Sequence, residues 1–223
     1  MFLKYGGDNM RVICYNIHSG TDKEKNPTLN EIIAYLKQQQ SDIICLQEVL
    51  YSQYKKIKFR LRMDGIFAEN VVDKEFGVCI LTKYKIVAQN HVLLTSKKEQ
   101  RGFAHIKVKI NDDGYLNIIN THLGLDKYER VKQIDEILDF ININLNGNIE
   151  NLIGNIICGD FNEKNIYLNN FEDVSMKLNK DNIPTFLNSR IDYCFEDTNL
   201  NITSYEVDKV YMSDHFPIIV DFS

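Results

Sequence analysis

Short apolar runs recur along the whole chain, and they constrain its fold more than any other feature. Each run is rich in Val, Ile, Cys or Tyr and is bounded by polar or turn-forming residues, which is typical of β-strands. The runs are residues 11–16, 42–46, 77–81, 105–110, 116–120, 155–158, 191–195, 202–207 and 218–222. Most are apolar throughout, which predicts strands buried on both faces, whereas HIKVKI at 105–110 alternates and predicts a strand with one wet face.

Two amphipathic segments predict helices. Residues 28–39 begin with TLNE, a capping box of Thr28 and Glu31, and carry apolar residues on one stripe. Residues 128–145 carry a second stripe, made of Tyr128, Val131, Ile134, Leu138, Ile141 and Leu145. Many strands and few helices, each helix with one apolar face, predict an α/β fold. We expect a four-layer α/β/β/α sandwich, in which two mixed β-sheets pack face to face with the helices outside.

The length and the hydrophobic content indicate one domain. With 223 residues, 44% of them hydrophobic, the chain can bury one sizeable core, so we expect a single domain over residues 1–223. Residues 1–9 precede the first apolar run and are expected to form a loose extension. The stretch 142–155 is rich in Asn and Gly and is expected to be a loop.

The charge balance and the cysteines argue against several classes of protein. A formal net charge of −5 disfavours tight, sequence-independent binding of duplex nucleic acid, and the short basic stretches at 55–62 and 97–101 are interpreted as solvated faces. No run approaches the roughly 20 apolar residues of a membrane span, and residues 1–9 lack the core of a signal peptide, so we expect a cytoplasmic protein. The five cysteines lie inside apolar runs, which predicts buried free thiols.

Residues that can bind a metal ion or a phosphate group lie at or beside the ends of many of the apolar runs. They are Asn16, Glu48, His122, Asp160, Asn162, Asp192, Asp214 and His215. A single Asp or Asn after a strand is usually turn chemistry. Strand ends that converge at one edge of a sheet, however, build a site from segments remote in sequence, and the repeated pattern predicts such a site here.

These residue types suit the attack of water on a phosphoester. Carboxylates with other oxygen ligands favour Mg²⁺, which can also bind substrate phosphate and neutralise the charge that builds on it. Histidines can protonate or hydrogen-bond the phosphoryl oxygens, and a partner carboxylate fixes their tautomer. Asn supplies neutral donors that add no repulsive charge.

The motifs YNIHSG, LQEV, THL, GDFN, IDY and SDHFP occur in this order between Arg11 and Phe222. The ordered set resembles the endonuclease/exonuclease/phosphatase superfamily, which has a DNase I-like fold, and in particular its compact bacterial members. The resemblance implies a Mg²⁺-dependent phosphoester hydrolase of the phosphodiesterase, nuclease or phosphatase type, in which Mn²⁺ can substitute.

The resemblance also implies roles for individual residues. Glu48 would be the main metal ligand, with Asn16 beside it and Asp214 next to the ion, directly or through water. Asp160 would orient or deprotonate the attacking water, and Asn162 would hold the phosphate or the nucleophile.

Further roles concern the histidines and their partners. His215 would contact the phosphate and pair with Asp192, and His122 would be a second phosphate contact or the acid for the leaving group. Arg101 resembles an arginine that meets a substrate phosphate, and Glu69 is a candidate partner of His122. The other histidines are interpreted as residues without a catalytic role: His18 as a loop residue near the site, His105 as a residue on a strand face, and His91 as a residue without a motif around it.

The substrate stays open, because loops rather than the shared residues set specificity. Nucleic acid, a nucleotide, a phosphorylated small molecule and, as in a sphingomyelinase, a phospholipid headgroup are all candidates, and a monomer is expected. The alternatives to an enzyme are a non-catalytic phosphate- or protein-binding module on the same fold and an unrelated α/β domain. The completeness of the motif set favours the enzyme.

Overall fold

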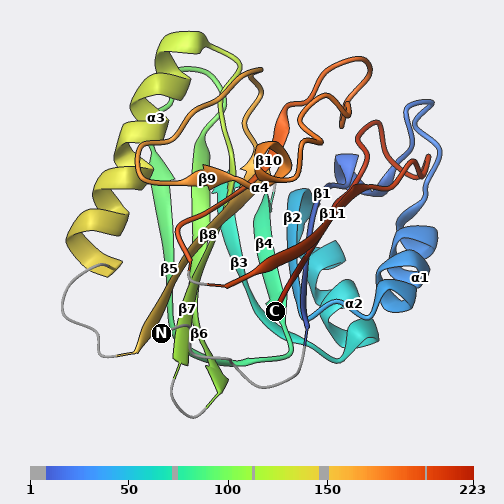
Figure 1. Cartoon of the computed structure of the whole chain (residues 1–223). Helices are drawn as coiled ribbons and strands as arrows, with labels where there is room; N and C mark the ends of the chain where they lie inside the picture. The colour runs from blue at the N-terminus through green and yellow to red at the C-terminus, as the bar shows by residue number, and fades with distance from the viewer. Residues whose placement is uncertain (1–8, 72–74, 112–113, 146–150, 199) are drawn as a thin grey trace.

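Two β-sheets pack face to face at the centre of the molecule (Figure 1). The computed structural model describes residues 9–71, 75–111, 114–145, 151–198 and 200–223. Helices α1 (Leu29–Gln39) and α2 (Tyr51–Leu61) cover the outer face of one sheet, and α3 (Lys127–Phe140) covers the outer face of the other. This is the expected four-layer α/β/β/α sandwich. No helix in the described ranges is long and apolar enough to cross a membrane.

The first sheet has six strands in the order β11-β12-β1-β2-β4-β3. Along the chain these are β1 (Met10–Asn16), β2 (Ile43–Leu50), β3 (Asp64–Val71), β4 (Phe76–Thr82), β11 (Ile202–Val207) and β12 (Ile218–Phe222). The sheet is mixed, because β1 runs parallel to β2 and antiparallel to β12.

The second sheet also has six strands, in the order β5-β6-β7-β8-β10-β9. Along the chain these are β5 (Lys85–Leu94), β6 (Arg101–Asn111), β7 (Gly114–His122), β8 (Leu152–Asp160), β9 (Glu172–Asp173) and β10 (Asp192–Glu196). Its central pair, β7 and β8, is parallel, and β10 runs antiparallel to β8. The described residues also form three short helical elements: η1 (His18–Gly20), a π-helical turn after α3 (Ile141–Leu145) and α4 (Val174–Lys177).

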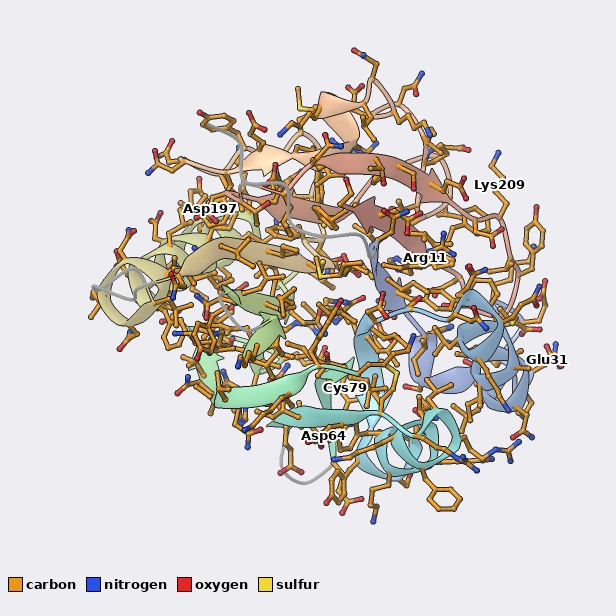
Figure 2. The ribbon with its side chains drawn as sticks, turned by 60° about the horizontal axis from the view of Figure 1, so that its bottom comes forward. Arg11, Glu31, Asp64, Cys79, Asp197 and Lys209 are labelled. Atoms are coloured by element: carbon orange, nitrogen blue, oxygen red, sulfur yellow. The ribbon has the colours of Figure 1, made fainter. Side chains whose placement is uncertain are left out.

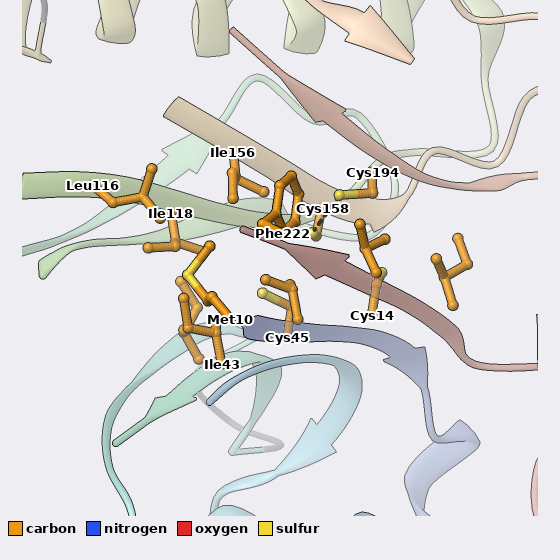
Figure 3. Packing of buried hydrophobic residues seen from close by; sticks show 14 of the residues in the cluster. Met10, Cys14, Ile43, Cys45, Leu116, Ile118, Ile156, Cys158, Cys194 and Phe222 are labelled. Atoms are coloured by element: carbon orange, nitrogen blue, oxygen red, sulfur yellow. Dashed lines mark hydrogen bonds between the residues drawn. The ribbon is translucent and has the colours of Figure 1, made fainter. Parts of the chain in front are cut away.

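Apolar side chains form three layers, one between the sheets and one beneath each set of helices. The inter-sheet layer contains Met10, Cys14, Cys45, Cys158 and Cys194, and Figure 3 shows these side chains between the two sheets. All five cysteines are buried and free, as expected. In Figure 2, Glu31 on α1 and Asp197 near α3 lie on opposite sides of the sandwich, which marks the two outer layers.

Several sequence-based expectations differ from the structure. Strands β3 and β5 were not predicted, because polar residues, EN in β3 and QNH in β5, interrupt their apolar runs, and most of β5 is exposed. The stretch 55–62 was interpreted only as a solvated face; it lies mostly in α2, where only Tyr54 and Ile57 are buried. The expected extension at residues 1–9 lies almost wholly outside the described residues. In the expected loop 142–155, residues 146–150 also lie outside them, and β8 already begins at Leu152.

The capping box predicted for the first helix does not form. Thr28 does stand at the N-cap of α1, but its side chain makes no capping hydrogen bond. Its hydroxyl donates instead to the carbonyl of Met212, at 2.5 Å. The residue therefore ties the start of α1 to the loop before β12.

The stripe predicted for the third helix is wrong in its first turns. Tyr128 and Val131 are 80% and 54% exposed, while Glu129, Arg130 and Gln133 are buried. These polar side chains face neighbouring loops and form hydrogen bonds with the backbone of those loops. Gln133, for example, donates to the carbonyl of Thr95 and accepts from the N–H of Gly124. The prediction also failed at His105, which is buried beside Asn90 and Asn117 and not on a wet face.

One edge of the sandwich collects the strand ends that matter for function. The parallel strands β1 and β2, and β7 and β8, all end there, and β10 and β12 begin there. The loops that follow these strands gather at the upper edge in Figure 1, from the start of α3 across to α1. Side chains from both sheets therefore meet at this edge.

Candidate active site

In β1, β8 and β10, the side chains that face the other sheet change from apolar to polar at the upper edge of the sandwich. Successive side chains on a strand alternate between its faces. Cys14 in β1 is therefore followed on the same face by Asn16, and Cys158 in β8 is followed by Asp160. In β10, which runs the other way, Asp192 precedes Cys194.

Strand register aligns three of the predicted residues in one row. In the second sheet, His122 of β7 pairs with Asp160 of β8, and Asp160 pairs with Asp192 of β10. Asn16 reaches this row from the first sheet, where its amide nitrogen donates to Asp160 Oδ2 at 3.1 Å. The opposed sheets therefore build one polar cluster at their shared edge.

Asp160 lies at the centre of this cluster and is 1% exposed. Its Oδ1 accepts the backbone N–H of Asn162 at 2.8 Å. Its Oδ2 lies 3.5 Å from His122 Nε2 and 3.7 Å from His215 Nε2. Asn162 holds a left-handed backbone, with φ of 52°, and its side-chain amide donates to the carbonyl of Leu123 at 2.9 Å. The turn after β8 is thus fixed by Asp160 and Asn162 themselves.

His215 is held between two carboxylates. Its Nδ1 lies 2.9 Å from Asp192 Oδ2, and its Nε2 faces Asp160. On its other side the ring packs against Phe186, with centroids 4.6 Å apart. The hydroxyl of Thr185 accepts the N–H of Asp192, and its carbonyl accepts the N–H of Phe216, the residue after His215. The segment around residue 185 therefore holds both Asp192 and His215 in position.

Arg101 fixes the tautomer of His122. The Nη1 of Arg101 lies 3.3 Å from His122 Nδ1. A guanidinium is always a donor, so Nδ1 accepts and the proton of the neutral ring sits on Nε2, which faces Asp160. His122 is therefore presented as a neutral hydrogen-bond donor. This geometry fits a phosphate contact better than an acid for the leaving group.

The two histidines have opposite proton affinities. Burial, followed by the positive charges of Arg101 and His215, holds the pKa of His122 well below its usual value. Burial also lowers the pKa of His215, but the charge and hydrogen bond of Asp192, helped by Asp160 and Asp214, outweigh it and raise that pKa to about 9. Burial and then the charge of Asp192 raise the pKa of Asp160 to about 7. At neutral pH the cluster therefore holds a proton on His215, between two carboxyl groups.

Glu48 approaches the cluster through a break in the β2–β4 ladder. The register of this pair shifts between Leu46 and Val49, and Glu48 adopts a left-handed backbone with φ of 54°. Bulges re-aim side chains at functional sites. Here the bulge turns the Glu48 carboxylate toward Asn16, whose amide nitrogen donates to Oε1 at 3.2 Å.

The residues at this point fit a divalent cation. The carboxylates of Glu48 and Asp160 converge on one neutral amide, that of Asn16, and no Lys or Arg of the described chain pairs with Glu48. Hard oxygen donors of this kind suit Mg²⁺. The amide nitrogen of Asn16 aligns the two carboxylates, and its amide oxygen accepts the N–H of His18 at 3.0 Å. A direct contact of this oxygen with a metal ion stays a prediction.

Asp160, Asp192 and His215 also offer ligand atoms within 4.8 Å of one another. The hydrogen bond between His215 and Asp192 occupies Nδ1 and one carboxylate oxygen. The hydrogen bond between His215 and Asp192 suits an acid–base role for this trio.

Asp214 lies at the mouth of the cluster, where its side chain is 27% exposed. Its Oδ1 lies 3.5 Å from His18 Nδ1, and the Lys25 ammonium contacts the other nitrogen of the same ring. His18 and Ser19 both have positive φ angles, of 46° and 54°. His18 therefore lies at the edge of the site, in agreement with the expectation of a loop residue near it.

Glu69 is not among the contacts of His122, whose two ring nitrogens face Arg101 and Asp160. Glu69 lies in β3 and acts instead on His91, where its charge opposes the lowering of the pKa by burial. The contacts of the described residues give no support to the predicted pair of Glu69 and His122.

Two supporting residues were missed because they are buried between the sheets. Asn120 in β7 donates from its amide to the carbonyls of Leu46 and Cys79, both at 2.8 Å, and accepts from Gln47 Nε2 at 2.6 Å. Leu46 and Cys79 are the last paired residues before the bulge that carries Glu48. An Asn and a Gln within the motifs INTH and LQEV were the only available signal.

Known proteins share this fold and this family. The model of the Endonuclease/Exonuclease/phosphatase family matches residues 13–215. No curated protein sequence matches the chain.

Three solved structures illustrate the likeness. TDP2 from D. rerio, in complex with a single strand DNA product, is 18% identical, with 97% of this chain and 100% of that chain covered and a TM-score of 0.79. The mannosyl-6-phosphatase Bt3783 of Bacteroides thetaiotaomicron is 20% identical, with 96% and 99% covered and a TM-score of 0.78. The human Nocturnin catalytic domain with a bound sulfate anion is 22% identical, with 96% and 93% covered and a TM-score of 0.77. These likenesses show the fold, and the family match over most of the chain shows that it belongs to the Endonuclease/Exonuclease/phosphatase family.

Proposed function

We propose that the chain hydrolyses a phosphoester bond by metal-assisted attack of water. One observation carries this proposal: His122 and His215, from separate segments, both direct Nε2 at Asp160 Oδ2, while Asn16 links the same oxygen to Glu48. A site with a basic carboxylate, two imidazole donors and a second carboxylate suits the charge changes of phosphoryl transfer.

Asp160 is the residue placed to accept a proton from water. Its raised pKa makes it a better base than an exposed carboxylate, and the N–H of Asn162 together with Asn16 fixes its orientation. In the proposal a water bound against Asp160 gives its proton to that carboxylate as its oxygen bonds to phosphorus, and the bond from phosphorus to the leaving oxygen breaks. The leaving oxygen takes up a proton from solvent, and Asp160 later returns the proton that it accepted to solvent.

The histidines act on the phosphoryl oxygens. Protonated His215 offers its Nε2–H to an oxygen that gains negative charge, and Asp192 stabilises that charged ring. Neutral His122 offers a second N–H from the opposite side, held in place by Arg101. Arg101 therefore acts through His122 in this structure, and a direct contact of its guanidinium with substrate phosphate stays a prediction.

Glu48 would hold the ion, with Asp214 beside it. When bound, Mg²⁺ or Mn²⁺ would neutralise charge on the substrate phosphate. Asn16 would keep the carboxylates of Glu48 and Asp160 apart and aligned.

The relatives support phosphoester chemistry without naming the substrate. Their names refer to a DNA product for one and to a sugar phosphatase for another. For this chain, we propose a phosphodiester or phosphomonoester substrate. A non-catalytic module is disfavoured because every residue of the hydrogen-bonded cluster is present and oriented.

The test is hydrolysis of bis(p-nitrophenyl) phosphate and of a panel of nucleic acids, nucleotides, sugar phosphates and sphingomyelin, with Mg²⁺ and with excess EDTA. We expect Asp160→Asn to lower kcat by orders of magnitude with an unchanged fold. Asp139→Asn, an exposed carboxylate on α3, is the matched control. Full turnover in EDTA, or in Asp160→Asn, would contradict the proposal.

A further inference from the structure

A hollow of about 480 Å³ lies beside the candidate active site, between the start of α3 and the turn after β8. Its walls include the apolar side chains of Val131, Ile134, Ile166 and Tyr167. None of these residues takes part in the proposed chemistry. The exposed side chains Val131 and Tyr167, at 54% and 79%, do not contribute to a core and are available to a ligand.

The hollow and the active site share two chain segments. At its floor, buried Arg130 pairs with Glu163, and its Nη1 donates to the carbonyl of Gly124 at 3.1 Å. Gly124 lies two residues after His122, and Glu163 directly follows Asn162. Both walls of the hollow therefore continue, within a few residues of the chain, into the segments that carry His122 and Asn162.

The turn that carries Tyr167 is anchored. The hydroxyl of Tyr193 donates to the carbonyl of Glu163 at 3.0 Å and accepts the N–H of Ile166 at 3.5 Å. Tyr193 is itself buried in β10, so the turn rests on the sheet. Tyr167 projects from a fixed wall and can serve as a stacking platform.

Two lysines give the hollow its charge. Lys127 and Lys164 line it, and neither ammonium forms an ion pair with a carboxylate of the described residues. Glu163 is already paired with Arg130, which leaves Asp135 as the one acidic lining residue without such a partner in the described chain. The site thus combines an apolar aromatic wall with free positive charge.

We propose that this hollow binds the base of a nucleotide unit next to the scissile phosphate, with the base against Tyr167 and its phosphate near Lys127 and Lys164. The proposal rests on the proposed function and names its substrate class. Stacking of bases on aromatic rings beside basic groups is the usual mode of binding single-stranded nucleic acid. A sugar phosphate has no apolar group to contact the apolar wall. The cationic headgroup of sphingomyelin would be repelled by the two lysines.

Equilibrium binding tests this without catalysis. Adenosine 5′-monophosphate and ribose 5-phosphate share their sugar phosphate and differ by the base, so their affinities in excess EDTA isolate the base contribution. We expect the nucleotide to bind about 5- to 30-fold more tightly. Tyr167→Ala should remove that preference, whereas Lys127→Met and Lys164→Met should weaken both ligands alike. Phe59→Ala, an 80% exposed aromatic residue on α2, is the control and should change neither.

Equal affinities for the two ligands, or a preference that survives in Tyr167→Ala, would overturn the base-binding site. Tighter binding of phosphocholine than of the nucleotide would overturn it in favour of a lipid headgroup. Absence of hydrolysis on every phosphoester would refute the proposed function alone, because the binding comparison is made without turnover.

Discussion

Asn120 offers a test of how the core supports the metal site. Its side chain crosses from β7 to the other sheet and satisfies two carbonyls, those of Leu46 and Cys79, at the ladder pair beside the bulge. Asn120→Ala leaves both buried acceptors without this donor. At about 1–3 kcal/mol for each of these two unsatisfied groups, the free energy of unfolding should fall by roughly 2–6 kcal/mol. A domain of this kind starts from about 5–15 kcal/mol, so the variant should remain folded.

The effect on function should exceed the effect on stability. Leu46 lies two residues before Glu48, and loss of a group that supports a metal ligand typically costs about 10- to 100-fold in metal affinity or activity. We therefore expect Asn120→Ala to need about 10- to 100-fold more Mg²⁺ for half-maximal hydrolysis of bis(p-nitrophenyl) phosphate. The measurement is a magnesium titration of the rate, made where urea denaturation shows the variant to be folded.

Asn117 is the matched control. It lies in the same strand with the same 0% exposure, but on the opposite face, where it contacts His105 and Asn155 at 3.0 Å each. Asn117→Ala should lose a similar free energy of unfolding and keep its magnesium requirement. If the two variants show the same magnesium titration, the bulge does not depend on Asn120 and the reasoning fails.

Three other changes probe single interactions. Glu48→Gln should abolish most of the rise in melting temperature on adding Mg²⁺, and an unaltered rise would place the ion elsewhere. His215→Ala and Asp192→Asn should each lower kcat by at least about 100-fold, since both remove the charged donor, and double-mutant additivity would show that they do not act together. Asp221 pairs with Arg11 at 2.7 Å, and the hydrogen bond holds its pKa below the ordinary value of 3.8. Its folded pKa is depressed, so the stability difference between wild type and Asp221→Asn should be present above about pH 5 and fade as the pH falls below about 4, and a difference that persists in acid would refute the pairing.

The sequence predicted the sandwich because its inner strands are apolar on both faces. The runs at 202–207 and 218–222 coincide with β11 and β12, and the other predicted runs lie within or largely overlap observed strands. The edge strands β3 and β5 were not predicted, because their exposed positions carry polar residues that interrupt the run of apolar residues. The face of α3 was misassigned because its first turns bury Glu129, Arg130 and Gln133 against loops, and no periodicity of apolar residues records that.

The candidate site was predicted as a set, while its internal order was not. Spacing in the sequence places His122, Asp160 and Asp192 at strand ends, and the register then aligns them. The partner of each side chain depends on atoms from other elements. His122 contacts Arg101 and not the predicted Glu69, and His18 contacts Asp214 from a loop with a left-handed backbone. Such contacts follow from tertiary packing, which has no local signature in the chain.

Residues of the inter-sheet layer and residues of the candidate site lie on the same faces of the same strands. Cys158 and Asp160 point the same way because they are two residues apart, and the same holds for Cys14 and Asn16. A shift of β8 by one residue would move Cys158 from the inter-sheet layer to the layer beneath α3 and would turn Asp160 away from His215. The packing that stabilises the sandwich therefore also specifies which atoms meet at its edge, so a variant that preserves the core volume but slips the register should lose activity before it loses the fold.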